Sequence, residues 1–493
     1  MISIERRKEA INSRPETVKK WLSQDGHRLG IITSIDGHQL ITLLLDSKER
    51  KAICLESELS SSTYHSLTPR LPLCHWQERI CWDMFGLLPE GHPRLKAAVL
   101  HEQYDQHFFP LRVTPASEEV HRHESRMHKF LEVKGDGVYE IPVGPIHAGV
   151  IEPGHFRFSC LGEVVLNLEI HLGYVHRGCE KRIVEMPWRK TRFVAEAAAT
   201  DSVCAYALAN ALCIESMFGI QPTLKGMRLR MMALEIERAA MHISDLIGFA
   251  ADIGYLGVAA SFSRLRGSAL RLGDLISGSR FLRGFIRAGG VSNNVSRQNI
   301  VLIKDTAEKL KSEIAVVSKI LLENQAAIER MSGIGKVSKA IAKTFGLVGV
   351  AGRACGLDYD ARIWSPDLPD FSVVCKNSGD VYARAQIRVE ELFVSLNAIC
   401  KLATEYPEED APFALLPDTL PANAVGLGIV EGHRGELIHL AFTDENGKLS
   451  RYAMKDPSVN NWTAVAIGIR NNLVADFPLC NKSFSLAYSG HDL

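Results

Sequence analysis

Side chains that could do chemistry gather in one short stretch of this 493-residue chain, HRGCEK at 176–181. It places His176, Arg177 and Lys181, which can all carry positive charge, beside the carboxylate of Glu180 at the end of a strand-like run. Arginine and lysine can stabilise a developing negative charge, and a carboxylate can take up and release a proton. The same group of charges is also typical of a surface salt bridge, so the residues alone leave both interpretations open.

The eleven cysteines are scattered, and none forms a C-x-x-C pair. Zinc-ribbon and ferredoxin-type sites therefore have no local support. Cys204 and Cys213 are nine residues apart, which is too far for a chelating pair on one helical turn. The cysteines are expected to be buried small hydrophobic residues.

A glycine-rich run at 346–362, GLVGVAGRACGLDYDAR, superficially resembles a nucleotide-binding loop. Its glycines do not fit the G-x-G-x-x-G spacing, and tight packing of a helix against a loop requires small residues equally. The run is therefore weak evidence for NAD binding.

Composition narrows the class of protein. Lysine and arginine number 57, aspartate and glutamate also number 57, and 46% of the residues are hydrophobic. This balance provides no basic field for nucleic acid, so no nucleic-acid partner is expected. No apolar run approaches the roughly 20 residues that cross a bilayer, and the first residues lack the apolar stretch of a signal peptide. We expect a cytoplasmic protein that can dock on a membrane partner.

The hydrophobic pattern predicts an α+β protein. A small N-terminal α+β domain is expected at 1–115, because a short helical pattern is followed by alternating strand-like runs. A polar, charged linker is expected at 116–136. A mainly helical domain with peripheral β-strands is expected at 137–493, with long amphipathic helices at 225–250 and 302–331 and a third after residue 379.

The N-terminal part resembles the 30 kDa subunit of respiratory complex I. ERICWDMFGLLPEGHPRL contains a Glu-Arg pair, an Asp-Met-Phe-Gly turn and a Gly-His-Pro turn in the order typical of that subunit. The matching residues are Glu78, Arg79, Asp83, Met84, Phe85, Gly86, Gly91, His92 and Pro93.

The remainder resembles the 49 kDa subunit of complex I and the large subunits of energy-converting nickel-iron hydrogenases. The matches are Gly144 and Pro145, the HRGxEK motif, Glu235, Arg238 and His242, and the runs 346–362, 379–391 and 431–439 (EGHRGELIH). The resemblance spans residues 70–493. A fusion of the two subunits is also what formate hydrogenlyase large subunits have.

The ligands of a nickel-iron centre are absent from this pattern. Lys482, Ser483 and Phe484 begin the run that leads into a metal-binding C-x-x-C pair in the hydrogenases, but Ala487 and Gly490 stand at the two cysteine positions. For the first cysteine pair two alignments are possible, which place either Ala195 and Ala198 or Ala199 and Ser202 there. Neither gives a thiolate, so we expect no metal on this chain.

Most donors of a quinone site are also replaced. In the 49 kDa family a tyrosine after HRGxEK and a histidine in the first strand loop bind the quinone headgroup. Here Trp188 occupies the tyrosine position and Pro153 the histidine position, leaving His147 and His155 nearby. Asp252 matches the acidic partner of that histidine.

The resemblance therefore implies the large subunit of an energy-converting hydrogenase-related complex, peripheral on the cytoplasmic face of the inner membrane. Its expected partners are a small iron-sulfur subunit that carries the cluster, a ferredoxin-like subunit and membrane antiporter-like subunits. It would bind no cofactor directly, and quinone is the candidate ligand. The expected roles are headgroup hydrogen bonding (His147, His155, Trp188), electrostatic stabilisation of a reduced species (Arg177) and proton relay (Glu180, Asp252). His176 and Arg177 are also expected to lie near the partner's cluster. The alternatives are a non-catalytic scaffold or conformational coupler, and a quinone-reducing subunit of the NADH:quinone oxidoreductase type.

Overall fold

The N-terminal region forms a four-stranded sheet in the order β1-β4-β3-β2. The computed structural model describes residues 2–105, 107–112, 128–147, 151–365, 371–407 and 411–493. The sheet strands are β1 (Ser3–Lys8), β2 (His27–Ser34), β3 (Gln39–Asp46) and β4 (Lys51–Glu58), and α1 (Arg14–Leu22) and α2 (His75–Phe85) pack on β2. The short parallel strands β5 (Thr63–His65) and β6 (Leu88–Glu90) lie beside them.

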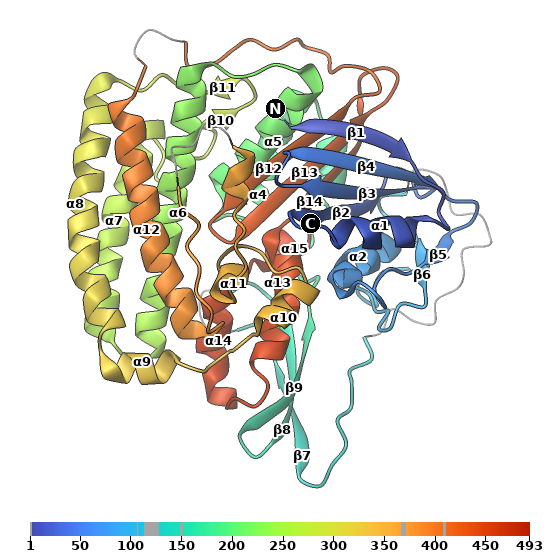
Figure 1. The fold of residues 1–493 in the computed structure, drawn as a ribbon, viewed down its shortest axis with the longest axis horizontal. Coiled ribbons are helices and arrows are strands. Elements are labelled where there is room, and N and C mark those ends of the chain that lie inside the picture. Colours follow the sequence, from blue (N-terminus) through green and yellow to red (C-terminus); the bar gives the residue numbers. More distant parts are fainter. Residues whose placement is uncertain (1, 106, 113–127, 148–150, 366–370, 408–410) are drawn as a thin grey trace.

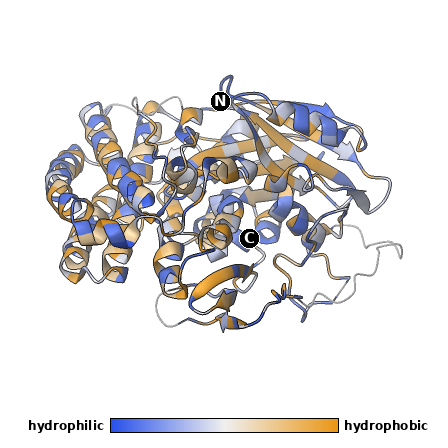
Figure 2. Ribbon diagram, turned by 60° about the horizontal axis from the view of Figure 1, so that its bottom comes forward, coloured by the Kyte–Doolittle hydropathy of each residue, from blue (hydrophilic) through white to orange (hydrophobic). Residues whose placement is uncertain are grey.

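Strands β2, β3 and β4 of this sheet are buried on both faces because a second sheet covers the face opposite the helices, whereas most residues of β1 are exposed. The second sheet consists of β12 (Val425–Gly432), β13 (Gly435–Thr443) and β14 (Leu449–Lys455), all antiparallel. Successive residues of a strand point to opposite faces. Accordingly Leu40 and Leu44 pack in the core beneath the helices, whereas Ile41 and Leu43 join a cluster with Ile438 of β13. The hydrophobic colour along these strands is visible in Figure 2.

Four long helices form the other half of the molecule (Figure 1). They are α6 (Leu224–Asp252), α7 (Leu256–Ser277), α8 (Arg297–Leu322) and α12 (Val381–Thr404). α6 packs against both α7 and α12, and α8 against the same two helices. Thr223 and Asp380 cap the first turns of α6 and α12, each accepting a hydrogen bond from a backbone N–H. Of the helices described, none is long and apolar enough to cross a membrane.

α5 (Val203–Phe218) joins the two halves by packing directly on β12. The close approach requires glycine: a Cβ at Gly428 would lie 2.0 Å from the carbonyl oxygen of Ala209, and one at Gly426 would lie 2.3 Å from that of Cys213.

A third antiparallel sheet, β7 (Val138–Val143), β8 (His155–Leu161) and β9 (Val164–His171), projects from the body next to the C-terminal helices (Figure 1). The remaining elements are α3 (Cys179–Val184), α4 (Thr191–Ala198), β10 (Ile286–Arg287), β11 (Gly290–Val291), α9 (Gln325–Met331), α10 (Lys339–Thr344), α11 (Gly349–Ala354), α13 (Pro457–Gly468), α14 (Phe477–Phe484) and α15 (Tyr488–His491).

The predicted α+β architecture is confirmed, with two refinements. The run at 302–331, predicted as one long helix, is divided between α8, which ends at Leu322, and α9, which begins at Gln325. The strands β12–β14 lie in the interior between α5 and the N-terminal sheet, whereas β7–β9 fit the expectation of peripheral strands. Residues 116–127 of the predicted linker lie outside the described residues, and the boundaries at 115 and 136 stay predictions. Nine of the eleven cysteines are buried, and Cys375 and Cys400 are partly exposed.

Candidate functional site

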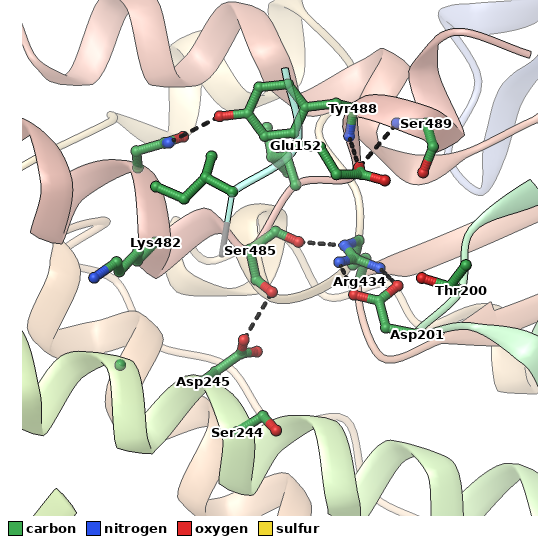
Figure 3. A pocket seen from close by; sticks show the side chains of 14 residues that line it. Glu152, Thr200, Asp201, Ser244, Asp245, Arg434, Lys482, Ser485, Tyr488 and Ser489 are labelled. Atoms are coloured by element: carbon green, nitrogen blue, oxygen red, sulfur yellow. Dashed lines mark hydrogen bonds and ion pairs between the residues drawn. The ribbon is translucent and has the colours of Figure 1, made fainter. Parts of the chain in front are cut away.

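A cavity of about 440 Å³ lies where α6, the C-terminal segment and the β12–β13 hairpin meet (Figure 3). Its lining comes from parts of the chain that are far apart in sequence: Ile151, Glu152, Thr200, Asp201, Ser244, Asp245, Gly248, Arg434, Asn481, Lys482, Ser485, Leu486, Tyr488 and Ser489. None of these side chains contains sulfur. The polar groups of the cavity are therefore oxygen and nitrogen.

Arg434 organises the wall of the cavity. It stands with His433 at the tip of the hairpin, because Gly432 pairs with Gly435 and leaves a two-residue loop. Its guanidinium forms a bidentate ion pair with Asp201, with Nη1 donating at 2.7 Å, and it also donates to Ser202 Oγ at 3.2 Å. Its Nε donates to the carbonyl oxygen of Ser485. Although burial raises the pKa of Asp201, the charge of Arg434 outweighs it and lowers that pKa.

Two further ion pairs border the cavity. Arg388 Nε lies 3.1 Å from Asp245 Oδ2, and Asp245 Oδ1 accepts a hydrogen bond of 2.8 Å from Ser485 Oγ. Lys482 Nζ lies 2.6 Å from Asp252 Oδ1 at the edge.

Glu152 holds the C-terminal segment from the other side. Its Oε2 accepts hydrogen bonds from the backbone N–H groups of Tyr488 and Ser489, each at 3.0 Å (Figure 3). Four carboxylates thus face three cationic side chains in and around the cavity: Glu152, Asp201, Asp245 and Asp252 against Arg388, Arg434 and Lys482. The excess of negative charge favours a neutral or cationic ligand over an anion.

The residues at the hydrogenase cysteine positions do not fit a nickel-iron centre. Ala487 and Gly490 carry no donor atom, and a Cβ at position 490 would lie 2.6 Å from the Asp456 carboxyl group. Asp456 is fixed there because its Oδ2 accepts a hydrogen bond of 2.7 Å from the buried hydroxyl of Tyr206. Even a methyl group at position 490 would therefore displace a buried acid. Within the described residues, no group of three or more histidine, cysteine, aspartate or glutamate side chains is placed to hold a metal ion.

Of the two alignments for the first cysteine pair, the structure brings the segment of the second to the C-terminal segment. Ser202 and Ser485 both contact Arg434, whereas Ala195 and Ala198 are buried in α4.

The lack of space at position 490 gives a stability prediction. We expect Gly490→Ala to lower the free energy of unfolding by about 1–3 kcal/mol through overpacking against Asp456. The matched control is Gly248→Ala on α6, where the nearest atom to a new Cβ is Lys482 Cδ at 3.7 Å. That change should be neutral or stabilising by up to about 1 kcal/mol. Urea unfolding of both variants measures the difference, and an equal effect at the two positions would contradict the packing described here.

The sequence-predicted residues do not converge on one site. Asp252 reaches the cavity edge through Lys482. Trp188 donates from its indole N–H to the carbonyl oxygen of Asp418 at 2.7 Å and packs on Phe218, so it does not line the cavity.

The two loop histidines are not among the residues that line the cavity. A ring nitrogen of His147 is 2.9 Å from the carbonyl oxygen of Gly154, and one of His155 is 3.2 Å from that of Gly144. Burial lowers the pKa of His155. Residues 148–150 of this loop lie outside the described residues.

Three residues of the HRGxEK motif contact three different parts of the chain. Arg177 is exposed and donates to the carbonyl oxygens of Ala197 and Ala198 at the end of α4. A ring nitrogen of His176 lies 3.1 Å from the carbonyl oxygen of Asp492. Glu180 is buried and accepts hydrogen bonds from Arg451 and from the backbone N–H of Met454. The roles predicted for these residues stay predictions.

Sequence reasoning missed Asp201, Asp245, Glu152 and Ser485. Arg434 lies within the EGHRGELIH motif and Lys482 within the C-terminal run, so both stretches carry a sequence signal, but no spacing rule connects them. Asp201 and Arg434 are 233 positions apart.

Two regions of the chain match models of protein families. Residues 12–119 match the 30 kDa subunit of respiratory-chain NADH dehydrogenase, and residues 252–422 match its 49 kDa subunit.

Known proteins are similar to this chain over most of its length. Formate hydrogenlyase subunit 5 of Escherichia coli (strain K12) is 28% identical over 98% of this chain and 88% of the relative. Hydrogenase-4 component G of the same organism is 27% identical over 98% and 87%. The NADH-quinone oxidoreductase C/D subunit of Phocaeicola vulgatus is 26% identical over 85% of each chain.

A solved structure shares the fold. A chain in the structure of the membrane-bound sulfane sulfur reductase, an archaeal respiratory membrane complex, superposes with a TM-score of 0.68 at 22% identity. The match covers 72% of this chain and 99% of that one.

Proposed function

We propose that this chain is the large redox subunit of a hydrogenase-related respiratory complex and that it works without a nickel-iron centre. The chain joins a 30 kDa-type and a 49 kDa-type domain of complex I in one polypeptide. It is therefore a subunit of a membrane-bound complex I-like or hydrogenase complex. It takes electrons from an iron-sulfur cluster in a small partner subunit and passes them to an acceptor in the cavity. A ferredoxin-like subunit and membrane antiporter-like subunits complete the assembly, and the redox reaction is coupled to ion translocation. The chain itself is peripheral on the cytoplasmic face of the membrane.

The cavity under the C-terminal segment is the observation that carries this proposal. It lies beside Ala487 and Gly490, where a hydrogenase would hold its metal, and its lining offers ion pairs and hydroxyl groups instead of sulfur. Of the lining groups, Arg434 and Lys482 are the ones that can stabilise negative charge as it develops on an acceptor during reduction. Since the carboxylates outnumber the cations, a neutral quinone headgroup suits the cavity better than an anionic polysulfide.

A second candidate function, a non-catalytic scaffold or conformational coupler, is favoured by one observation. Each of the three cations at the cavity already has a carboxylate partner: Arg434 with Asp201, Arg388 with Asp245, and Lys482 with Asp252. Closed pairs of this kind are what a purely structural junction requires.

The test is an assay of the purified assembly, reduced through its iron-sulfur subunit, with a quinone analogue, protons and sulfane sulfur offered as separate acceptors. The proposal expects turnover with quinone and no hydrogen. Evolution of hydrogen would instead indicate a hydrogenase function. A lack of electron transfer to all three acceptors would favour the scaffold.

The Asp252→Asn variant distinguishes the redox subunit from the scaffold. We expect it to lower turnover by roughly tenfold or more with the assembly intact, because it removes the charge that holds Lys482 at the cavity edge and a proton-accepting group. The control is Asp418→Asn, which breaks a surface pair with Arg189 in which the aspartate side chain is 96% exposed. Turnover of both variants is measured beside the amount of each protein in the assembly, and unchanged turnover in Asp252→Asn would favour the scaffold.

A further inference from the structure

A buried network of charged side chains extends from the cavity into the interior between α6 and α12. Asp245 of α6, which lines the cavity, pairs with Arg388 of α12. Three residues before Asp245 on α6 and three residues after Arg388 on α12, His242 Nε2 and Glu391 Oε2 are 2.9 Å apart. Because residues three apart share a helix face, the two pairs are successive rungs between the same two helices.

From Glu391 the network continues through Arg353 of α11. Its Nε donates to Glu391 Oε1 at 2.9 Å, and its Nη1 donates to Glu431 Oε1 at 2.7 Å. The same Nη1 lies 3.4 Å from Asp360 Oδ2. Glu431 Oε2 accepts a hydrogen bond of 2.9 Å from the backbone N–H of Ala361.

Two more arginines complete the network. Arg362 donates to both carboxylate oxygens of Asp360, at 3.0 and 2.7 Å. Arg238 donates to Glu235 Oε2 at 3.2 Å and to the backbone carbonyl oxygen of Glu431. None of the charged side chains named in the network beyond the cavity pair is more than 2% exposed.

The charges of this network do not balance. It contains four carboxylates (Glu235, Asp360, Glu391 and Glu431) and three guanidinium groups (Arg238, Arg353 and Arg362), and an arginine does not release its proton in a protein. An uncompensated charge in so buried a place is costly. The network is therefore neutral only when one additional proton resides on a carboxyl group or on His242.

Glu431 is the group best suited to hold that proton. Burial, together with the negative charge of Asp360, raises the pKa of Glu431 to about 7, against the opposing charges of Arg353 and Arg238. Burial lowers the pKa of His242, and the arginine and histidine around Glu391 hold the pKa of that carboxyl well below its usual range.

We propose that this network stores one exchangeable proton and releases it toward the cavity when an electron reaches the acceptor there. The inference rests on the proposed function for the source of the electron, which is the partner's iron-sulfur cluster. In the step, the O–H bond of the Glu431 carboxylic acid breaks and leaves a carboxylate, and the reduced acceptor gains the proton. Solvent then returns one proton to the network.

The transfer is expected to follow the hairpin that carries Glu431. At its tip, two residues further along, His433 Nδ1 is 3.4 Å from Ser202 Oγ, which Arg434 of the cavity wall also contacts. A route through Glu391 and His242 would have to take the proton through Arg353, which keeps its own proton.

The substitution Glu431→Gln tests the stored proton without any activity measurement. A carboxyl group with a higher pKa in the folded than in the unfolded protein binds more protons when folded between the two values. The stability it contributes is therefore lost as the pH rises from about 4.5 to about 7. A glutamine side chain does not titrate, so the variant does not lose stability in this way. The ratio of the wild-type unfolding constant to the unfolding constant of the variant should therefore rise roughly tenfold or more between about pH 5 and about pH 8.

Glu436→Gln is the matched control. Glu436 lies directly opposite Glu431 in the hairpin and is equally buried, but it pairs with Lys455 at 3.2 Å outside the network. For Glu436→Gln the same ratio of unfolding constants should not rise between these pH values, because the partners of Glu436 lower the pKa of its carboxyl group. A flat ratio for Glu431→Gln, or the same rise in both variants, would overturn the proposal.

A second measurement uses the unaltered assembly. Reduction through the iron-sulfur subunit should remove a carboxylic-acid band from the infrared difference spectrum, and this loss should be absent in Glu431→Gln. An acceptor that is reduced without any loss of that band refutes the stored proton and leaves the proposed function intact. Conversely, the predicted stability ratio in an assembly that reduces no acceptor would support the protonated network and count against the redox function.

Discussion

The substitution Gly248→Trp is expected to reduce electron transfer to the cavity acceptor by about a hundredfold. Gly248 lies on the α6 wall of the cavity, and the nearest atom to a Cβ added there is 3.7 Å away, so an indole can enter the cavity without displacing backbone. The side chain would take space that the acceptor needs. Misplacement of a reactant by about 1 Å is enough for a loss of this size. Steady-state turnover of the purified assembly measures the effect.

The control for a bulky residue on a helix is Gly257→Trp. Gly257 is an exposed position of α7 with no neighbouring atom within 4 Å of an added Cβ. The expected turnover is that of the wild type. Equal turnover in both variants would mean that the cavity does not take part in the reaction.

Replacing Arg353 with leucine should have the largest effect on stability, lowering the free energy of unfolding by about 3–5 kcal/mol. Its guanidinium is completely buried and contacts three carboxylates, Asp360, Glu391 and Glu431. Without it these acids share one cation fewer in a region without water access. Chemical denaturation near neutral pH gives the value.

An exposed pair provides the comparison. Arg264 lies 3.0 Å from Glu313, but its side chain is 62% exposed, so Arg264→Leu should cost less than about 1 kcal/mol. A similarly small cost for Arg353→Leu would show that the buried network does not hold α11, α12 and the β12–β13 hairpin together.

The sequence predicted the helical body well because amphipathic spacing is a local property. The run at 225–250 became α6, and the run after residue 379 became α12, each beginning at a capping side chain. The depth of β12–β14 was not predictable in the same way. Apolar residues on both faces of a strand indicate that the strand is buried, but they do not indicate that the N-terminal sheet covers it.

The site was predicted only in part, for a related reason. Asp252 was found because a family motif gives its position, and the structure places its partner Lys482 at the cavity. Counting along the chain from HRGxEK aligned Trp188 with the family's tyrosine, but it could not predict where the side chain points. The indole N–H donates a hydrogen bond to the backbone carbonyl of Asp418. The pair of Asp201 and Arg434 depends on a hairpin tip meeting a helix start, which no local pattern encodes.

The central claim is that a hydrogenase-shaped body works here without a metal-thiolate centre. The most direct test is metal analysis of the purified assembly combined with X-ray absorption spectroscopy at the nickel edge. We expect iron from the partner's cluster and no nickel bound to this chain. Nickel present in proportion to the chain, with sulfur in its coordination shell supplied by this polypeptide, would contradict the claim.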